Sequence, residues 1–218
     1  MDSLWKLAGI LLVLYSLVYG MLMAVPQLAI LEESIRNLYY HVPMWFGMIF
    51  LFLGSAVSSI MFLNNQKIKN DVWAVEFARI GLVFGVLGMI TGMLWALVTW
   101  GDFWSNDPKQ NASAIALLIY FAYFVFRGAF KDQFTKAKFS AIYNIFAFFA
   151  IIPLIFVLPR MTDSLHPGSG GNPGFSIYDL DNTMRWVFYP AVVGFTLIGF
   201  WLAQIGYRIK ILKLPEND

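Results

Sequence analysis

Long apolar stretches alternate with short polar segments along almost the whole chain. A helix that crosses a membrane needs about 20 mostly apolar residues, and six stretches meet this requirement. They cover roughly residues 4–25, 42–63, 76–98, 112–130, 139–158 and 186–207. The pattern therefore predicts an all-α integral membrane protein with six transmembrane helices, in a single domain over residues 1–218.

The composition agrees with a membrane protein. Of 218 residues, 59% are hydrophobic and 13% are charged, whereas a soluble domain has about 45–50% apolar and about 25% charged residues. The formal net charge is only +2, so we expect no nucleic-acid partner. Cysteine is absent, which excludes thiolate metal sites and iron–sulfur clusters. Histidines are the strong metal ligands that remain.

Basic residues predict the orientation of the chain, because short loops rich in Lys and Arg stay in the cytoplasm. They gather in the second and fourth connections and in the C-terminal tail: Lys67, Lys69, Arg127, Lys131, Lys136, Lys138, Arg208, Lys210 and Lys213. We therefore expect both termini in the cytoplasm and three outer connections, residues 26–41, 99–111 and 159–185. The first apolar stretch is longer than the core of a signal peptide, so we expect it to be a retained anchor.

The two histidines of the chain, His41 and His166, both fall on the outer side in this topology. Two neutral imidazoles can hold a haem iron from opposite axial sides. A zinc site needs three or four ligands, so carboxylates would have to join the histidines. Two histidines that bond only to water or backbone are the alternative at this stage.

The segments around the histidines favour a site. His41 stands in YYHVPMW, where Pro43 suggests the first turn of a helix. His166 stands in DSLHPGSGGNPGF, whose glycines and prolines disfavour helix and let the backbone approach a flat ligand.

A third segment, TWGDFWSNDPKQNAS, joins the third and fourth stretches. Its aromatic residues Trp100, Phe103 and Trp104 offer large faces that can stack on a porphyrin. Two ordinary explanations compete: tryptophans are common at the membrane surface, and Asp107 before Pro108 is typical of a helix N-cap and first residue.

Small and polar residues inside the apolar stretches predict helix contacts. Gly81, Gly85, Gly88 and Gly92 share one helix face, where a neighbouring helix can approach closely. Asn144 is isolated in an apolar helix, so we expect it to bond across a helix contact.

The order of three motifs in a six-helix chain, YYHVP, WGDFWSND and SLHPGS, resembles the haem-handling proteins of cytochrome c maturation. Within that group the chain is most similar to the haem exporter protein C family, over roughly residues 36 to 207. The resemblance implies that His41 and His166 are the axial ligands of a non-covalent haem b. It also implies a haem platform made by Trp100, Gly101, Trp104 and Asp107.

The resemblance further implies a function in transfer rather than catalysis. Such a protein sits in the bacterial inner membrane and holds haem on the periplasmic side. It passes the haem to the haem chaperone E, and works with an ATP-binding cassette complex of components A and B and with the small membrane protein D. Two positions depart from the family pattern: Asn106 replaces a tryptophan and Lys109 replaces an arginine, and lysine cannot reproduce a bidentate arginine contact.

Three other functions stay open on the sequence alone. A b-type haem electron-transfer subunit also uses paired histidines, although its ligands usually lie inside helices. A haem transporter would need broken helices and polar groups near the middle of the membrane. A scaffolding subunit would use its outer loops to bind only proteins.

Overall fold

The computed structural model describes residues 3–166 and 180–213. Within them the long helices are α1 (Leu4–Leu22), α2 (Leu38–Asn65), α3 (Ile68–Trp100), α4 (Pro108–Gly128), α5 (Gln133–Ile152) and α6 (Asn182–Ile211). The shorter helical segments are the 3₁₀ helix η1 (Glu32–Asn37), the π-helical turn η2 (Pro153–Val157) and the 3₁₀ turn η3 (Leu158–Arg160). All six long helices are apolar enough to cross a membrane, so the predicted fold class is confirmed.

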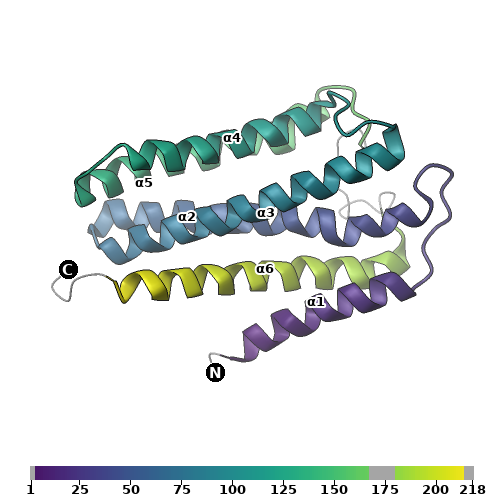
Figure 1. The fold of residues 1–218 in the computed structure, drawn as a ribbon, viewed down its shortest axis with the longest axis horizontal. Helices are drawn as coiled ribbons and strands as arrows, with labels where there is room; N and C mark the ends of the chain where they lie inside the picture. Colours follow the sequence, from purple (N-terminus) through teal and green to yellow (C-terminus); the bar gives the residue numbers. More distant parts are fainter. Residues whose placement is uncertain (1–2, 167–179, 214–218) are drawn as a thin grey trace.

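Helices α2 and α3 form the centre of the bundle (Figure 1). α2 packs against α3, α5 and α6, while α4 packs against α5 and α1 lies along α6. In the core between α2 and α4, the rings of Phe52 and Tyr120 stack with their centroids 3.4 Å apart. α1 begins and α6 ends at the same end of the bundle (Figure 1).

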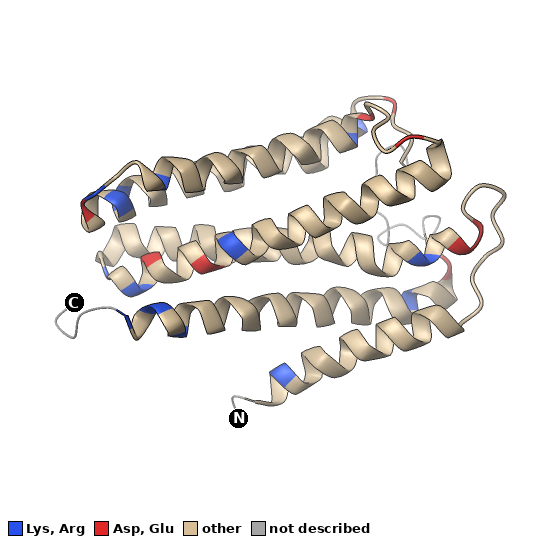
Figure 2. Cartoon of the chain, in the orientation of Figure 1, with Lys and Arg blue, Asp and Glu red and all other residues tan. Residues whose placement is uncertain are grey.

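Charged residues gather toward the two ends of the bundle, and both signs are present at each end (Figure 2). The end where α1 begins is rich in lysine and arginine, and we call it the basic end. The opposite end, which we call the acidic end, holds the connections that carry Glu32, Glu33, Asp102, Asp163 and Asp181. Both histidines lie at the acidic end, His41 near the start of α2 and His166 after η3.

Helix α2 starts earlier than its hydropathy predicted, because η1 runs directly into it. His41 therefore lies inside the helix, near its start. The expectation that Pro43 lies in the first turn of its helix is wrong, since α2 begins at Leu38 and Pro43 is an interior residue. There it deprives the carbonyl of Tyr39 of its helical N–H donor.

Helix α3 is longer than a membrane requires. Its 33 residues extend about 50 Å, whereas the hydrocarbon core of a bilayer is about 30 Å thick. At least one end of the helix therefore extends beyond the hydrocarbon layer. Of the predicted outer connection 159–185, residues 167–179 lie outside the described part of the chain.

Polar contacts inside the bundle join helices. The predicted contact of Asn144 is confirmed: its side-chain amide on α5 donates to the hydroxyls of Ser55 and Ser59 on α2, at 2.6 and 2.8 Å. Near the basic end, Arg127 of α4 donates two hydrogen bonds to Asp71 of α3, at 2.8 and 2.5 Å. Because both members of this ion pair are largely buried, each depends on the other for its charge to be tolerated.

The buried pair gives a stability prediction. Replacing Asp71 by asparagine leaves the Arg127 guanidinium without a compensating charge, and we expect a loss of about 3 kcal/mol of folding free energy. Thermal unfolding in detergent should show a clear drop in Tm. The control is Glu33→Gln, which breaks the contact of Arg36 with a carboxylate that is 63% exposed and should change Tm little. Equal Tm values for the two variants would contradict the prediction.

Candidate functional site

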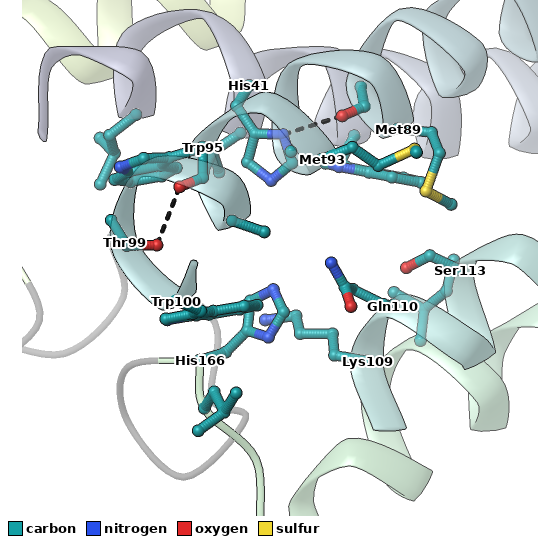
Figure 3. A pocket seen from close by; sticks show the side chains of 18 of the residues that line it. His41, Met89, Met93, Trp95, Thr99, Trp100, Lys109, Gln110, Ser113 and His166 are labelled. Atoms are coloured by element: carbon teal, nitrogen blue, oxygen red, sulfur yellow. Dashed lines mark hydrogen bonds between the residues drawn. The ribbon is translucent and has the colours of Figure 1, made fainter. Parts of the chain in front are cut away.

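A pocket of about 450 Å³ opens at the acidic end of the bundle, within the range typical of ligand sites. Its walls come from residues 30 and 31 before η1, from α2, α3, the first turns of α4 and the π-helical turn η2, and from Leu165 and His166. Most of the lining is apolar and includes Leu38, Val42, Trp45, Phe46, Met89 and Ile155. The imidazoles of His41 and His166 enter this pocket from opposite sides (Figure 3).

The imidazole of His41 is fixed by the backbone of α3. Its Nδ1 lies 2.9 Å from the carbonyl oxygen of Gly88 and 3.3 Å from the hydroxyl of Thr91. A carbonyl oxygen only accepts hydrogen bonds, so Nδ1 carries the proton and donates it. The other ring nitrogen, Nε2, therefore keeps its lone pair and points into the pocket (Figure 3).

The imidazole of His166 has the same arrangement with a different acceptor. Its Nδ1 lies 2.8 Å from Oδ1 of Asp107, whose side chain is fully buried. Nδ1 donates to this carboxylate, and the Nε2 of His166 faces the pocket (Figure 3). A carboxylate that accepts from a histidine fixes the ring orientation and makes the opposite nitrogen a better donor to a metal.

Asp107 joins two parts of the acidic end through its two carboxylate oxygens. One oxygen accepts from the backbone N–H of Lys109 at 2.9 Å, so the predicted N-cap of α4 is confirmed. The other accepts from the hydroxyl of Ser164 at 2.8 Å and from the N–H of Leu165 at 2.7 Å. This single side chain therefore holds the start of α4 against the segment that carries His166.

The electrostatics of this contact follow from burial and hydrogen bonding. Burial lowers the pKa of the His166 imidazole, although the hydrogen bond to Asp107 opposes the shift. Burial alone would raise the pKa of Asp107, but the hydrogen bonds from His166, Ser164 and Leu165 outweigh it and hold this pKa well below its usual range. At neutral pH, His166 is therefore neutral and Asp107 ionised, which makes their contact a charge-assisted hydrogen bond.

The four residues of the expected platform occupy different places. Trp100 lines the pocket, and its ring meets that of His166 edge to face at a centroid distance of 5.0 Å. Gly101 ends α3 in the left-handed conformation, with φ of 86°. Trp104 lies on the connection that follows and is 36% exposed, outside the pocket lining. Asp107 is buried against His166, so its contact is with a candidate ligand rather than with the pocket itself.

Several residues that shape the site escaped the sequence analysis. Gly88, Thr91 and Gly92 surround the ring of His41. The glycine spacing on α3 was the signal for them, but it indicated only helix packing. Gln110 of α4 was also missed: its side-chain oxygen accepts from the N–H and hydroxyl of Ser105, which fixes the aromatic connection.

The described residues thus define a multi-helix membrane protein with a largely apolar pocket between two imidazoles. The family model described as "Heme exporter protein C" matches residues 2–217, and the chain belongs to this family.

Relatives carry the same description. The chain is 26% identical over 185 residues to the "Heme exporter protein C" of Haemophilus influenzae, covering 83% of this chain and 73% of that protein. It is 27% identical over 170 residues to the protein of the same description from Rhodobacter capsulatus, and the match covers 76% of this chain and 68% of that protein. It is 24% identical over 185 residues to the protein of the same description from Escherichia coli strain K12, and the match covers 85% of this chain and 74% of that protein.

The role of Asp107 can be tested in the protein without any ligand. A neutral asparagine at this position weakens the hydrogen bond with the Leu165 N–H, and a bond to a charged group contributes about 1.5–3 kcal/mol. We therefore expect hydrogen exchange at Leu165 to accelerate roughly 10- to 100-fold in Asp107→Asn. Mass spectrometry of peptides that cover residues 161–166 measures this change.

The matched control is Asp181→Asn. Asp181 also caps a helix at the acidic end, where it accepts from the N–H of Thr183 at 2.8 Å. This variant should accelerate exchange at Thr183 and leave Leu165 unchanged. If Leu165 exchanges at the same rate in the native protein and in Asp107→Asn, Asp107 does not hold this segment.

Proposed function

We propose that the protein binds a non-covalent haem b in the pocket, with His41 and His166 as the two axial ligands, and delivers it for cytochrome c assembly. The observation that carries the proposal is the pair of unprotonated Nε2 atoms that enter one pocket from opposite sides. Two such donors, one on each face of the ring, can fill both axial positions of a porphyrin iron.

The composition of the pocket supports a flat, apolar ligand that brings its own donors. Across the described ranges 3–166 and 180–213, no cluster of three or more His, Asp or Glu side chains is arranged to hold a metal ion. Two imidazoles alone are a poor site for a bare cation but suffice when a macrocycle supplies the other four nitrogens. The apolar lining would exclude water from the ring.

The pocket also has a polar edge for the haem carboxylates. Lys109, Gln110 and Ser113, all in the first turns of α4, line this side. We place the propionates here, because a lysine ammonium forms charge-assisted bonds with carboxylates. Lys109 stands where the family pattern has arginine, and a single ammonium makes a less directional contact than a guanidinium.

In this proposal haem is cargo rather than a catalytic cofactor, and the protein is not an enzyme. We place the acidic end in the periplasm and both termini in the cytoplasm of a bacterial inner membrane, in accord with the charge separation in Figure 2. The expected partners are the haem chaperone E as acceptor, components A and B of the ATP-binding cassette complex, and the small membrane protein D.

Delivery requires that one axial ligand can leave. His166 is the better candidate, because it lies on a non-helical segment whereas His41 is built into α2. An acceptor that provides its own ligand would replace His166, and the difference in affinity between the two sites would drive the transfer.

The ligand assignment is tested by replacing each histidine with alanine. Each variant should lose the six-coordinate spectrum of a bis-imidazole haem. The affinity for haem should fall by more than the roughly 10- to 100-fold that removal of a ligand's hydrogen-bonding partner costs. Added imidazole should restore the spectrum, since it can fill the vacated position. Unchanged bis-imidazole spectra in both variants would contradict the assignment of the two histidines as axial ligands.

The two tryptophans of the platform should differ in effect. Trp100 lines the pocket beside His166, whereas Trp104 does not. Trp100→Leu should therefore shift the absorption spectrum of bound haem and lower its affinity roughly tenfold, the order of an aromatic contact worth about 0.5–1.5 kcal/mol. Trp104→Leu, titrated with haem in parallel, should leave both nearly unchanged. A larger effect of Trp104 would place the haem against the outer connection instead.

A membrane electron-transfer subunit is the second candidate, because His41 lies within a helix as the ligands of such subunits do. Rapid reduction of the bound haem by quinol would favour it. A haem that is released to an acceptor without a change in oxidation state would favour delivery.

A further inference from the structure

Four glycines lie on one face of α3, and each packs against a different side chain. They are Gly81, Gly85, Gly88 and Gly92. A Cβ atom placed on Gly81 would lie 2.7 Å from the ring of Phe52, and one on Gly88 would lie 3.0 Å from the indole of Trp45. At Gly92, nearest the acidic end, the neighbour is the imidazole of His41. The same sequence pattern therefore supports core packing at one end and a candidate ligand at the other.

The contact at Gly92 involves the edge of the ring that carries both nitrogens. A Cβ there would lie 2.6 Å from Cε1, 3.1 Å from Nδ1 and 3.5 Å from Nε2 of His41. A separation of 2.6 Å is far inside van der Waals contact, which for carbon atoms is about 3.5–4.0 Å. The imidazole occupies the space that a side chain at residue 92 would fill.

Two tryptophan rings limit how far the imidazole can move aside. The rings of Trp45 and Trp95 stand edge to face against it, with centroids 6.3 and 6.0 Å away. Trp95 is itself fixed, because its indole N–H donates to the hydroxyl of Ser34 at 3.1 Å. A displaced imidazole would therefore lose the hydrogen bond from its Nδ1 to the carbonyl of Gly88, one helical turn before Gly92.

We propose that Gly92 is a positioning residue for His41. The missing side chain lets the nitrogen-bearing edge of the imidazole lie close against α3, where the Gly88 carbonyl holds the proton on Nδ1 and directs Nε2 into the pocket. The inference rests on the proposed function for the use made of Nε2, but the position and tautomer of the ring can be measured without haem.

The first test uses nitrogen NMR of the haem-free protein. In His166→Ala, labelled histidine reports on His41 alone, because the chain has two histidines. The spectrum should show a protonated Nδ1 and an unprotonated Nε2. Adding Gly92→Ala should shift the signals toward those of free imidazole, which exchanges its proton between both nitrogens. Unchanged signals would overturn the inference and leave the proposed function standing.

A second test separates the contact with His41 from a general packing defect. Gly92→Ala should lower Tm in detergent, and a further His41→Ala should recover most of that loss because it vacates the space that Cβ needs. Gly81→Ala is the matched control on the same helix face, and its Tm should not recover when His41 is removed. An equal loss from Gly92→Ala with and without His41 would overturn the inference.

The haem titration then links position to function. Gly92→Ala should lower haem affinity roughly tenfold or more, as loss of ligand orientation does elsewhere, and added imidazole should restore the six-coordinate spectrum. Gly81→Ala should bind haem with the native spectrum. If His41→Ala itself leaves the spectrum unchanged, the proposed function fails, whereas a native spectrum in Gly92→Ala alone overturns only the positioning role.

Discussion

The site depends on one repeated interaction, the hydrogen bond that each imidazole donates from Nδ1 to the protein. His41 donates to a backbone carbonyl of α3 and His166 to the carboxylate of Asp107. A histidine whose proton is held on one nitrogen presents a lone pair on the other, in a fixed direction. Without these acceptors the rings could take either tautomer, and the pocket would have no defined donors. The surrounding fold can be understood as the means of placing the two acceptors on opposite sides of one cavity.

Helix α3 contributes most to this placement. At its acidic end it provides the carbonyl of Gly88 beside His41 and the ring of Trp100 beside His166. Nearer the basic end, Asp71 on the same helix is paired with Arg127 of α4. Since α4 starts at Asp107 and Pro108, this ion pair and the Asp107 contacts fix α4 at both of its ends. The relative position of the two histidines thus follows from the packing of α3 against α2 and α4.

The amount that could be predicted from sequence differs between the fold and the site. Apolar length alone predicted six helices, because a segment in lipid must satisfy its backbone internally. Helix ends were less predictable: hydropathy placed the start of α2 near residue 42, whereas the continuous turn from η1 brings it to Leu38. Among site residues, Asp107 was expected both as an N-cap and as a platform residue, but its contact with His166 joins positions 59 residues apart. Local sequence patterns carry no information about such a pairing, nor about which neighbour each glycine of α3 meets.

The unequal surroundings of the two histidines bear on how a bound ligand would be exchanged. His41 is part of a helix, is confined by two tryptophans, and donates to a neutral carbonyl. His166 follows a short irregular segment, and its ring donates to the Asp107 carboxylate, which also accepts from Ser164 and Leu165. Displacing the whole segment 164–166 from Asp107 would break the bonds of Ser164, Leu165 and His166 to one carboxylate. In the proposed function, a competitor for the Asp107 carboxylate would weaken all of these bonds at once, because they share one acceptor side chain.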